Sequence, residues 1–96
     1  MATFISLANW TDQGVKNAKD SVQRAGEYRA ALERRGIKML SIYWTVGAYD
    51  IVLTAEAPDV QTMTSSLLAL AGFGNVRTTT LTAFNQQEMQ TIIQNI

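Results

Sequence analysis

Four stretches of the chain carry the hydrophobic pattern of β-strands. Their residues are β-branched or aromatic, or alternate between apolar and polar at every second position, which suits a pleated surface with one buried face. The predicted strands cover residues 3–9, 37–46, 51–57 and 76–84. Gly47 and Ala48, between the second and third of them, predict a hairpin.

Three other stretches repeat their apolar residues at helical spacing, which predicts helices with one buried side. The first is expected to begin at Thr11, a good N-cap, and to run to about Arg35, because Gly36 favours a helix stop. The second follows Pro58, which is preorganised for a first helical turn. The third begins with a capping box at residues 85–88 and is short.

The predicted order is strand, helix, strand, strand, helix, strand and a short terminal helix. Two βαβ halves joined by a hairpin make a ferredoxin-like arrangement, so we expect an α+β fold, βαββαβ with a short C-terminal helix. Residues 1–96 should form a single domain, since a chain of 96 residues can bury one core. The two main helices would cover one face of the sheet, leaving the other face wet or covered by a partner.

The alternation along each strand predicts which side chains share a face of the sheet. The face under the helices is expected to hold Ile5, Leu7, Leu40, Ile42, Val46, Ile51, Leu53 and Ala55. The opposite face is expected to hold Phe4, Ser6, Ala8, Trp10, Met39, Ser41, Tyr43, Thr45, Val52, Thr54, Glu56, Thr78, Thr80 and Thr82. This mixed set is too apolar for a fully solvent-exposed surface and too polar for a hydrophobic core. It suits a sheet that faces a second sheet across a partly hydrated cavity.

Composition and charge narrow the range of functions. The 8 basic and 8 acidic residues cancel, which argues against a general nucleic-acid binder. The chain has no His and no Cys, so the commonest metal ligands and the commonest general base are missing, and we expect neither metal nor cofactor. The amino terminus enters a strand-like run directly, so we expect no secretion and no membrane, with the cytoplasm as the default location.

Several motifs in register give the chain a resemblance to a known family. They are Phe4-Ile5-Ser6-Leu7, Asn9-Trp10-Thr11-Asp12-Gln13-Gly14, Lys19-Asp20-Ser21, Gly47-Ala48-Tyr49-Asp50, Glu56-Ala57-Pro58-Asp59 and Gly74-Asn75-Val76-Arg77-Thr78. With these motifs the chain is identified as a member of the GYD domain family over nearly its whole length. Ala48 stands inside the triplet that names the family. The resemblance implies a ferredoxin-like subunit of a dimeric α+β barrel, and it implies no particular activity.

A more distant resemblance suggests a mechanism. The hairpin Gly47-Ala48-Tyr49-Asp50 and the later Gly74-Asn75-Val76-Arg77-Thr78-Thr79-Thr80 are similar to the effector-binding half of the leucine-responsive regulator family. That family binds amino acids between protomers. The helix-turn-helix that reads DNA is absent here. The resemblance therefore implies a stand-alone sensor or binding subunit that acts through another protein.

The candidate ligand-binding residues come from the mixed face and the hairpin. Tyr43 and Trp10 would form apolar walls with polar tips, and Glu56 would be the single charge. The full set is Ser6, Trp10, Ser41, Tyr43, Tyr49, Asp50, Glu56 and Thr78. Structural alternatives stay open: Trp10 can staple the first helix, Asp50 can accept from nearby backbone, and Tyr49 can pack at a subunit boundary.

Three classes of function follow. The first is a stand-alone small-molecule-binding or sensing module with a ligand cavity between the sheets of a homo-oligomer. The second is a cofactor-free oxygenase or isomerase of the dimeric α+β barrel type, with Glu56 or Asp50 as the base and Tyr43, Trp10 and Asn9 as the other available groups. The third is a structural assembly subunit. The expected partners are further copies of the chain and a small-molecule ligand.

Overall fold

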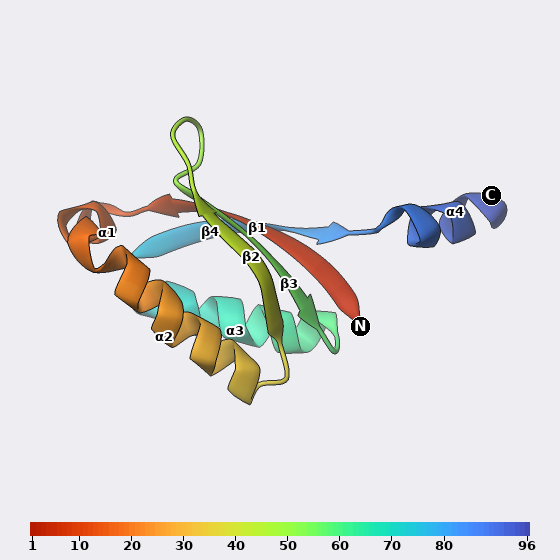
Figure 1. Ribbon diagram of the computed structural model, residues 1–96, viewed down its shortest axis with the longest axis horizontal. Helices are drawn as coiled ribbons and strands as arrows, with labels where there is room; N and C mark the ends of the chain where they lie inside the picture. The colour runs from red at the N-terminus through yellow and green to blue at the C-terminus, as the bar shows by residue number, and fades with distance from the viewer.

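The computed structural model describes all residues from 1 to 96. Strands and helices follow one another in the predicted order (Figure 1). They are β1 (Ala2–Trp10), α1 (Asp12–Lys16), the 3-10 helix η1 (Ala18–Asp20), α2 (Ser21–Arg34), β2 (Lys38–Trp44), β3 (Ile51–Ala57), α3 (Val60–Gly72), β4 (Val76–Ala83) and α4 (Gln86–Gln94). None of the helices has the length and apolarity that a membrane span requires.

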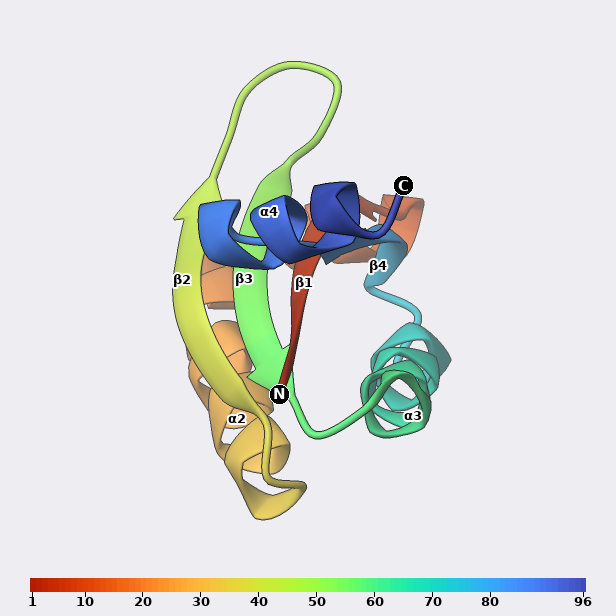
Figure 2. The same ribbon diagram turned by 90° about the vertical axis from the view of Figure 1, so that its right-hand side faces the viewer.

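The four strands form one antiparallel sheet in the order β2-β3-β1-β4. Both long helices, α2 and α3, lie on the same face of this sheet (Figures 1 and 2). This is the ferredoxin-like α+β arrangement, so the predicted fold class is confirmed. We call the other face the open face. By strand register it carries Thr3, Ile5, Leu7, Asn9, Lys38, Ser41, Tyr43, Val52, Thr54, Glu56, Arg77, Thr79, Leu81 and Ala83.

The helix ends follow the predicted local signals. Thr11 caps α1 by accepting a hydrogen bond from the Gly14 N–H (3.1 Å). Asn85 and Glu88 form the predicted capping box at the start of α4. Gly36, which follows α2, has a φ of 76°, a conformation that glycine adopts without strain. These boundaries depend on neighbouring residues only, which is why they were predictable.

The first predicted helix is interrupted, so the expectation of one continuous helix to about Arg35 was wrong. It breaks at Asn17, whose backbone (φ −104°, ψ 23°) is outside the helical range. The Asn17 side chain donates to the Gln13 carbonyl (3.1 Å), and Arg24 donates to the Asn17 carbonyl (2.7 Å). Asparagine competes for backbone groups in this way, so it separates α1 from η1 and α2.

α1 packs closely against the turn that precedes β4. A Cβ atom at Gly14 would lie 1.9 Å from the Asn75 carbonyl oxygen, so only glycine fits at this position. The Thr11 N–H donates to the same carbonyl (3.1 Å), and the Thr11 hydroxyl donates to the Gly74 carbonyl. The Gln13 side-chain amide donates to the Asn75 side-chain oxygen (3.0 Å). We call this junction the Gly14–Asn75 contact.

The connection between β2 and β3 is a loop of residues 45–50, longer than a tight turn at Gly47 and Ala48 alone. The Thr45 N–H donates to the Asp50 carbonyl across the base of this loop (2.8 Å). The loop stands out from the rest of the domain (Figures 1 and 2). Val46 lies in this loop and is fully exposed, so its predicted place under the helices was wrong.

The predicted faces of β1 and β4 were also wrong. Ser6 and its neighbours at every second position of β1 are buried under the helices, and Ile5 and Leu7 are on the open face. The Ser6 hydroxyl shares a hydrogen bond with the Thr80 hydroxyl (2.8 Å), so this polar pair is satisfied beneath the helices. The residues that move to the helix face are Phe4, Ser6, Ala8, Trp10, Thr78, Thr80 and Thr82.

The two remaining strands differ from each other. β3 has the predicted parity, but β2 contains a register shift directly after Met39. Because of this bulge, both Met39 and Ile42 face the helices, and Leu40 is left exposed. The predicted face was therefore right for Ile42 and wrong for Met39 and Leu40.

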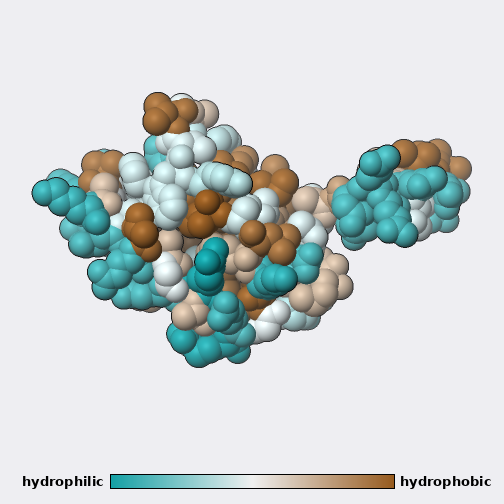
Figure 3. All heavy atoms as spheres, in the orientation of Figure 1, coloured by the Kyte–Doolittle hydropathy of each residue, from teal (hydrophilic) through white to brown (hydrophobic).

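α4 extends away from the rest of the chain (Figure 1). Its apolar side chains gather on one side of the helix (Figure 3). These residues are Met89, Ile92 and Ile93, followed by Ile96 just after the helix, and their exposed fractions range from 39% to 100%. A helix with one apolar side gains stability when another surface covers that side, and a single copy of the chain supplies no such surface.

Replacement of Gly14 tests the contact with the turn before β4. We expect Gly14→Ala to lower the free energy of unfolding by about 2–3 kcal/mol, because the new methyl group forces two backbone segments apart. The matched control is Gly26→Ala in α2, where an added Cβ meets nothing within 4 Å. That variant should be stabilised by about 0.5–1 kcal/mol. Urea denaturation of both variants measures the difference, and equal stabilities would contradict it.

Candidate functional site

A cavity of about 310 Å³ lies between the sheet and the two long helices. α2 and α3 form its walls, and the helix face of all four strands forms its floor. The apolar part of the lining includes Ala8, Ile42, Ile51, Leu53, Leu67, Leu70 and Val76. The volume falls at the lower end of the range found for small-molecule pockets, about 300–1,000 Å³.

Two buried polar atoms of lining residues have no hydrogen-bond partner in the chain. They are the indole Nε1 of Trp10 and the phenol oxygen of Tyr28. Burial raises the pKa of Tyr28, with Ser66 and Arg35 acting in the opposite direction. The Ser66 hydroxyl lies close enough to the phenol to lower its pKa, but it donates its own proton to the Met63 carbonyl (2.7 Å), and the two hydroxyls do not reach hydrogen-bond geometry with each other. Buried polar groups without a partner are rare in folded proteins, and here two of them belong to one cavity.

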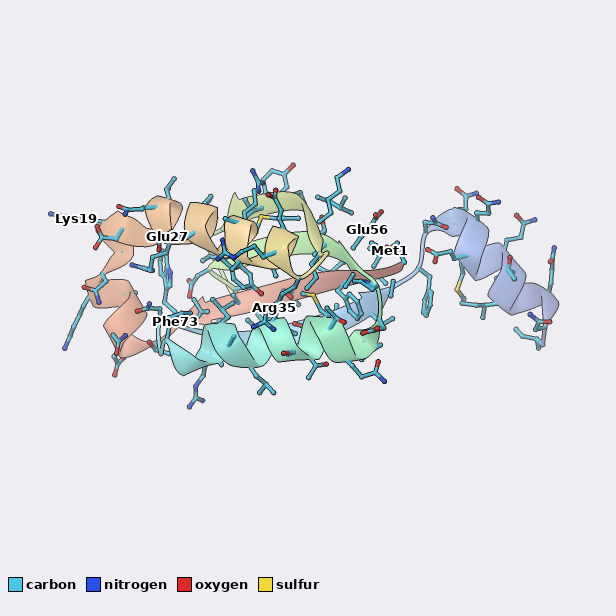
Figure 4. All side chains as sticks on the ribbon, turned by 90° about the horizontal axis from the view of Figure 1, so that it is seen from below. Met1, Lys19, Glu27, Arg35, Glu56 and Phe73 are labelled. Carbon is cyan, nitrogen blue, oxygen red and sulfur yellow. The ribbon has the colours of Figure 1, made fainter.

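Charged residues lie at the edges of the cavity. Arg24, Glu27 and Arg34 of α2 contribute to its lining, and Glu27 and Arg34 are exposed to solvent. Figure 4 views the helix layer and shows α2 and α3 side by side, with Arg35 between them. Arg35 donates to the Ser65 hydroxyl of α3 (2.7 Å), so a hydrogen bond ties the two helices together. The site is therefore apolar inside and charged where it meets water.

The structure divides the predicted ligand-binding residues between the two faces of the sheet. Ser6, Trp10 and Thr78 line the cavity under the helices. Ser41, Tyr43 and Glu56 belong to the open face. The prediction that these six residues share one face was wrong, because the parity of β1 and β4 is the reverse of that expected.

Tyr49 and Asp50 lie in the loop before β3. The Asp50 carboxylate accepts a hydrogen bond from the Trp10 N–H (2.9 Å), and the Asp50 N–H donates to the Ala8 carbonyl (2.9 Å). The Tyr49 carbonyl accepts from the Thr45 hydroxyl. Asp50 therefore ties the loop to the end of β1, which agrees with the structural alternative for this residue.

Two pairs of polar residues on the open face are matched across adjacent strands. The Ser41 and Thr54 hydroxyls share a hydrogen bond (2.6 Å). Glu56 stands opposite Lys38 in the register, an arrangement of opposite charges that favours strand pairing. Tyr43 is 65% exposed and lies on an edge strand. Its aromatic ring and its hydroxyl group are therefore both accessible on this face.

Sequence reasoning missed the contribution of α2 to the site. Ala25, Tyr28 and Ala31 line the cavity and recur at a spacing of three. That spacing places them on one side of a helix, where two small residues leave room beside a tyrosine. The pattern was visible, but it does not distinguish a packed core from a cavity.

Comparison with known proteins adds to this geometry. The family model described as GYD domain matches residues 4–93. The chain belongs to the GYD domain family. Several GYD motifs now have structural roles, since Trp10 to Gly14 form the Gly14–Asn75 contact with the turn at Gly74 and Asn75, and Asp50 holds the Trp10 backbone.

A relative of this GYD chain is the "Glutamine synthetase and cystathionine beta-lyase binding protein" of Thermus thermophilus. The two sequences are 38% identical over 84 residues, which make up 86% of this chain and 88% of the relative. No solved structure matches the chain. The similarity covers nearly the full length of both proteins.

Removal of the Asp50 carboxylate tests its structural role. We expect Asp50→Ala to lower the free energy of unfolding by about 1–3 kcal/mol, because the Trp10 N–H loses its acceptor. Asp50→Asn keeps a side-chain oxygen and should lose less than half of that amount. Asp20→Ala is the control, because this exposed carboxylate precedes α2 and makes no capping hydrogen bond. Unchanged stability of Asp50→Ala in urea denaturation would leave this carboxylate free for a ligand.

Proposed function

We propose that this chain is a regulatory binding module that works as a homo-oligomer and binds metabolic enzymes. The observation that carries the proposal is its similarity to a protein named for binding glutamine synthetase and cystathionine β-lyase. The shared region makes up 88% of that relative, so most of its sequence has a counterpart in this chain. This also agrees with the sequence-based expectation of a binding subunit that acts through another protein.

The open face supports the homo-oligomer. Its central strands carry Ile5, Leu7 and Val52, which are only partly buried in a single copy. Two such faces packed against each other would remove this apolar surface from water, which is the main driving force of association. A specific interface has to bury more than about 1,000 Å² in total, and a four-stranded sheet offers a continuous surface for it.

α4 supports the same assembly. The helix projects beyond the sheet and contacts no covering surface in its own copy (Figure 1). A second copy brings a second apolar face, and we assign the apolar side of α4 to it. The sequence-based expectation allowed docking on its own domain or on a neighbour, and the position of α4 favours the neighbour.

The loop of residues 45–50 is our candidate for the enzyme contact. It projects away from the sheet and from α4 (Figures 1 and 2), and it carries the fully exposed Val46. An apolar side chain at the tip of a projecting loop can enter a recess on a partner without disturbing the contact between two sheets. Residues buried at the centre of a protein interface contribute most of its binding energy.

A small molecule between two sheets stays a prediction of the sequence. The predicted groups that would still face it are Ser41, Tyr43 and Glu56. The alternative of a cofactor-free oxygenase or isomerase requires Trp10, Tyr43 and Glu56 to act in one site. The structure does not favour it, because Trp10 lies on the opposite face of the sheet from Tyr43 and Glu56. The third alternative, a purely structural subunit, differs from the proposed module in that it would bind no enzyme.

The mass of the protein in solution tests the homo-oligomer. Light scattering at micromolar concentration should give at least about twice the chain mass of 10.6 kDa. Val52→Lys places a charge at the centre of the open face and should shift the protein to the monomer. Leu68→Lys changes an apolar residue that is 70% exposed on α3, and should leave the mass unchanged. A monomeric wild type would contradict the proposed assembly.

Binding to purified glutamine synthetase and cystathionine β-lyase from the same organism tests the function. Biolayer interferometry should detect binding of the wild-type chain to at least one of them, and none to an unrelated enzyme of similar mass. Val46→Asp should weaken the binding at least about tenfold, because it places a charge at the apolar tip of the loop.

The matched control is Ala48→Asp, which adds the same charge to the same loop and should retain most of the affinity. Absence of wild-type binding to both enzymes at high micromolar concentration would refute the proposed function. Normal binding by Val46→Asp would refute only the assignment of the contact to the loop.

A further inference from the structure

We propose that the cavity between the sheet and helices α2 and α3 is a binding site for a small, mainly apolar molecule that carries a carbonyl or carboxylate oxygen. This site is separate from the open face and from loop 45–50. It therefore does not depend on the proposed homo-oligomer or on enzyme binding. It is also distinct from the predicted ligand position between two sheets.

The indole of Trp10 is the first observation that points to a ligand. Its Nε1–H can only donate, it is buried, and it has no acceptor. The other indole of the chain, at Trp44, donates to the Ser21 hydroxyl (2.9 Å). The indole N–H of the partly exposed Trp44 therefore has an acceptor within the chain, whereas the indole N–H of Trp10 has none. Asp50 holds the Trp10 backbone, so the side chain projects from a fixed point of β1.

The phenol of Tyr28 is the second observation. A phenylalanine would give the same apolar contacts from α2 without burying an unpartnered hydroxyl. Tyr28 comes from a different element than Trp10, yet both residues line the same cavity. One free hydrogen-bonding group from the sheet and one from the helix layer can each bind a polar atom of a ligand among apolar walls.

Volume and charge define the class of ligand. A water molecule takes up about 30 Å³ of liquid, so 310 Å³ holds a molecule of roughly ten non-hydrogen atoms. The apolar lining suits an aromatic or branched hydrocarbon body. The indole requires an acceptor, and two arginines against one glutamate at the edges favour an oxygen with negative charge. A small aromatic or branched carboxylic acid, or its amide, meets these requirements.

The test uses three probes with the same hydrocarbon skeleton: 3-phenylpropanoate, 3-phenylpropanamide and propylbenzene. Nitrogen-15 NMR of the full-length protein follows the two indole N–H signals, which Trp44→Phe assigns. Millimolar acid or amide should shift the Trp10 signal downfield, since the N–H gains an acceptor, and leave the Trp44 signal in place. Propylbenzene offers no acceptor and should bind at least about threefold more weakly.

Three variants separate the site from general effects. Tyr28→Phe should weaken the acid and the amide roughly 3- to 10-fold while the protein stays folded, because it removes one hydrogen-bonding group. Ala25→Phe fills the cavity and should abolish binding, whereas Ala30→Phe makes the same change at an exposed position of α2 and should have no effect.

Each outcome decides the proposal. An unmoved Trp10 signal with millimolar acid and amide overturns it, as does equal affinity for propylbenzene or equal affinity in the wild type and Tyr28→Phe. Ala25→Phe tests the cavity only if that variant folds. The result for Tyr28→Phe tests the proposal independently of Ala25→Phe. Binding of the probes together with failure to bind the enzymes would support the cavity and refute the proposed function.

Discussion

The close approach of Gly14 to the Asn75 carbonyl is the constraint on which the rest of the domain depends. It brings the end of β1 against the start of β4, two segments that are far apart in the sequence and adjacent in the sheet. Trp10 and Asn75 lie on either side of this junction, and both line the cavity under the helices. The shape of the cavity at that end is therefore set by a backbone contact that a methyl group would prevent.

The order and type of the elements could be predicted because they depend on local signals. Caps at Thr11 and Asn85 and the stop at Gly36 involve only nearby residues. The faces of β1 could not be predicted in the same way. Ile5 and Leu7 are more apolar than Ser6 and Ala8, yet the smaller pair is the one that fits beneath the helices. Hydropathy identifies a buried face only when the other face is polar.

The candidate site was only partly predictable for a related reason. Ser6, Trp10 and Thr78 were named as ligand-binding residues and do line a cavity, but the cavity is on the side of the sheet opposite to that expected. Tyr28 was not named, because a tyrosine on the inner side of a helix usually has a partner for its hydroxyl. Whether the Tyr28 hydroxyl has a hydrogen-bond partner depends on how α2 and α3 pack against each other. The spacing of residues along the chain does not predict this packing.

The position of β4 has a consequence for how the protein is made. β1 lies inside the sheet and needs β4 as a neighbour, as the hydrogen bond between Ser6 and Thr80 shows across 74 positions of the sequence. During synthesis β1 emerges before β4, and it keeps one unpaired edge until residues 76–83 have left the ribosome. A nascent chain that stalls before Val76 therefore exposes a central strand to other chains. Emergence of β4, more than local helix formation, sets the moment at which both edges of this central strand are paired.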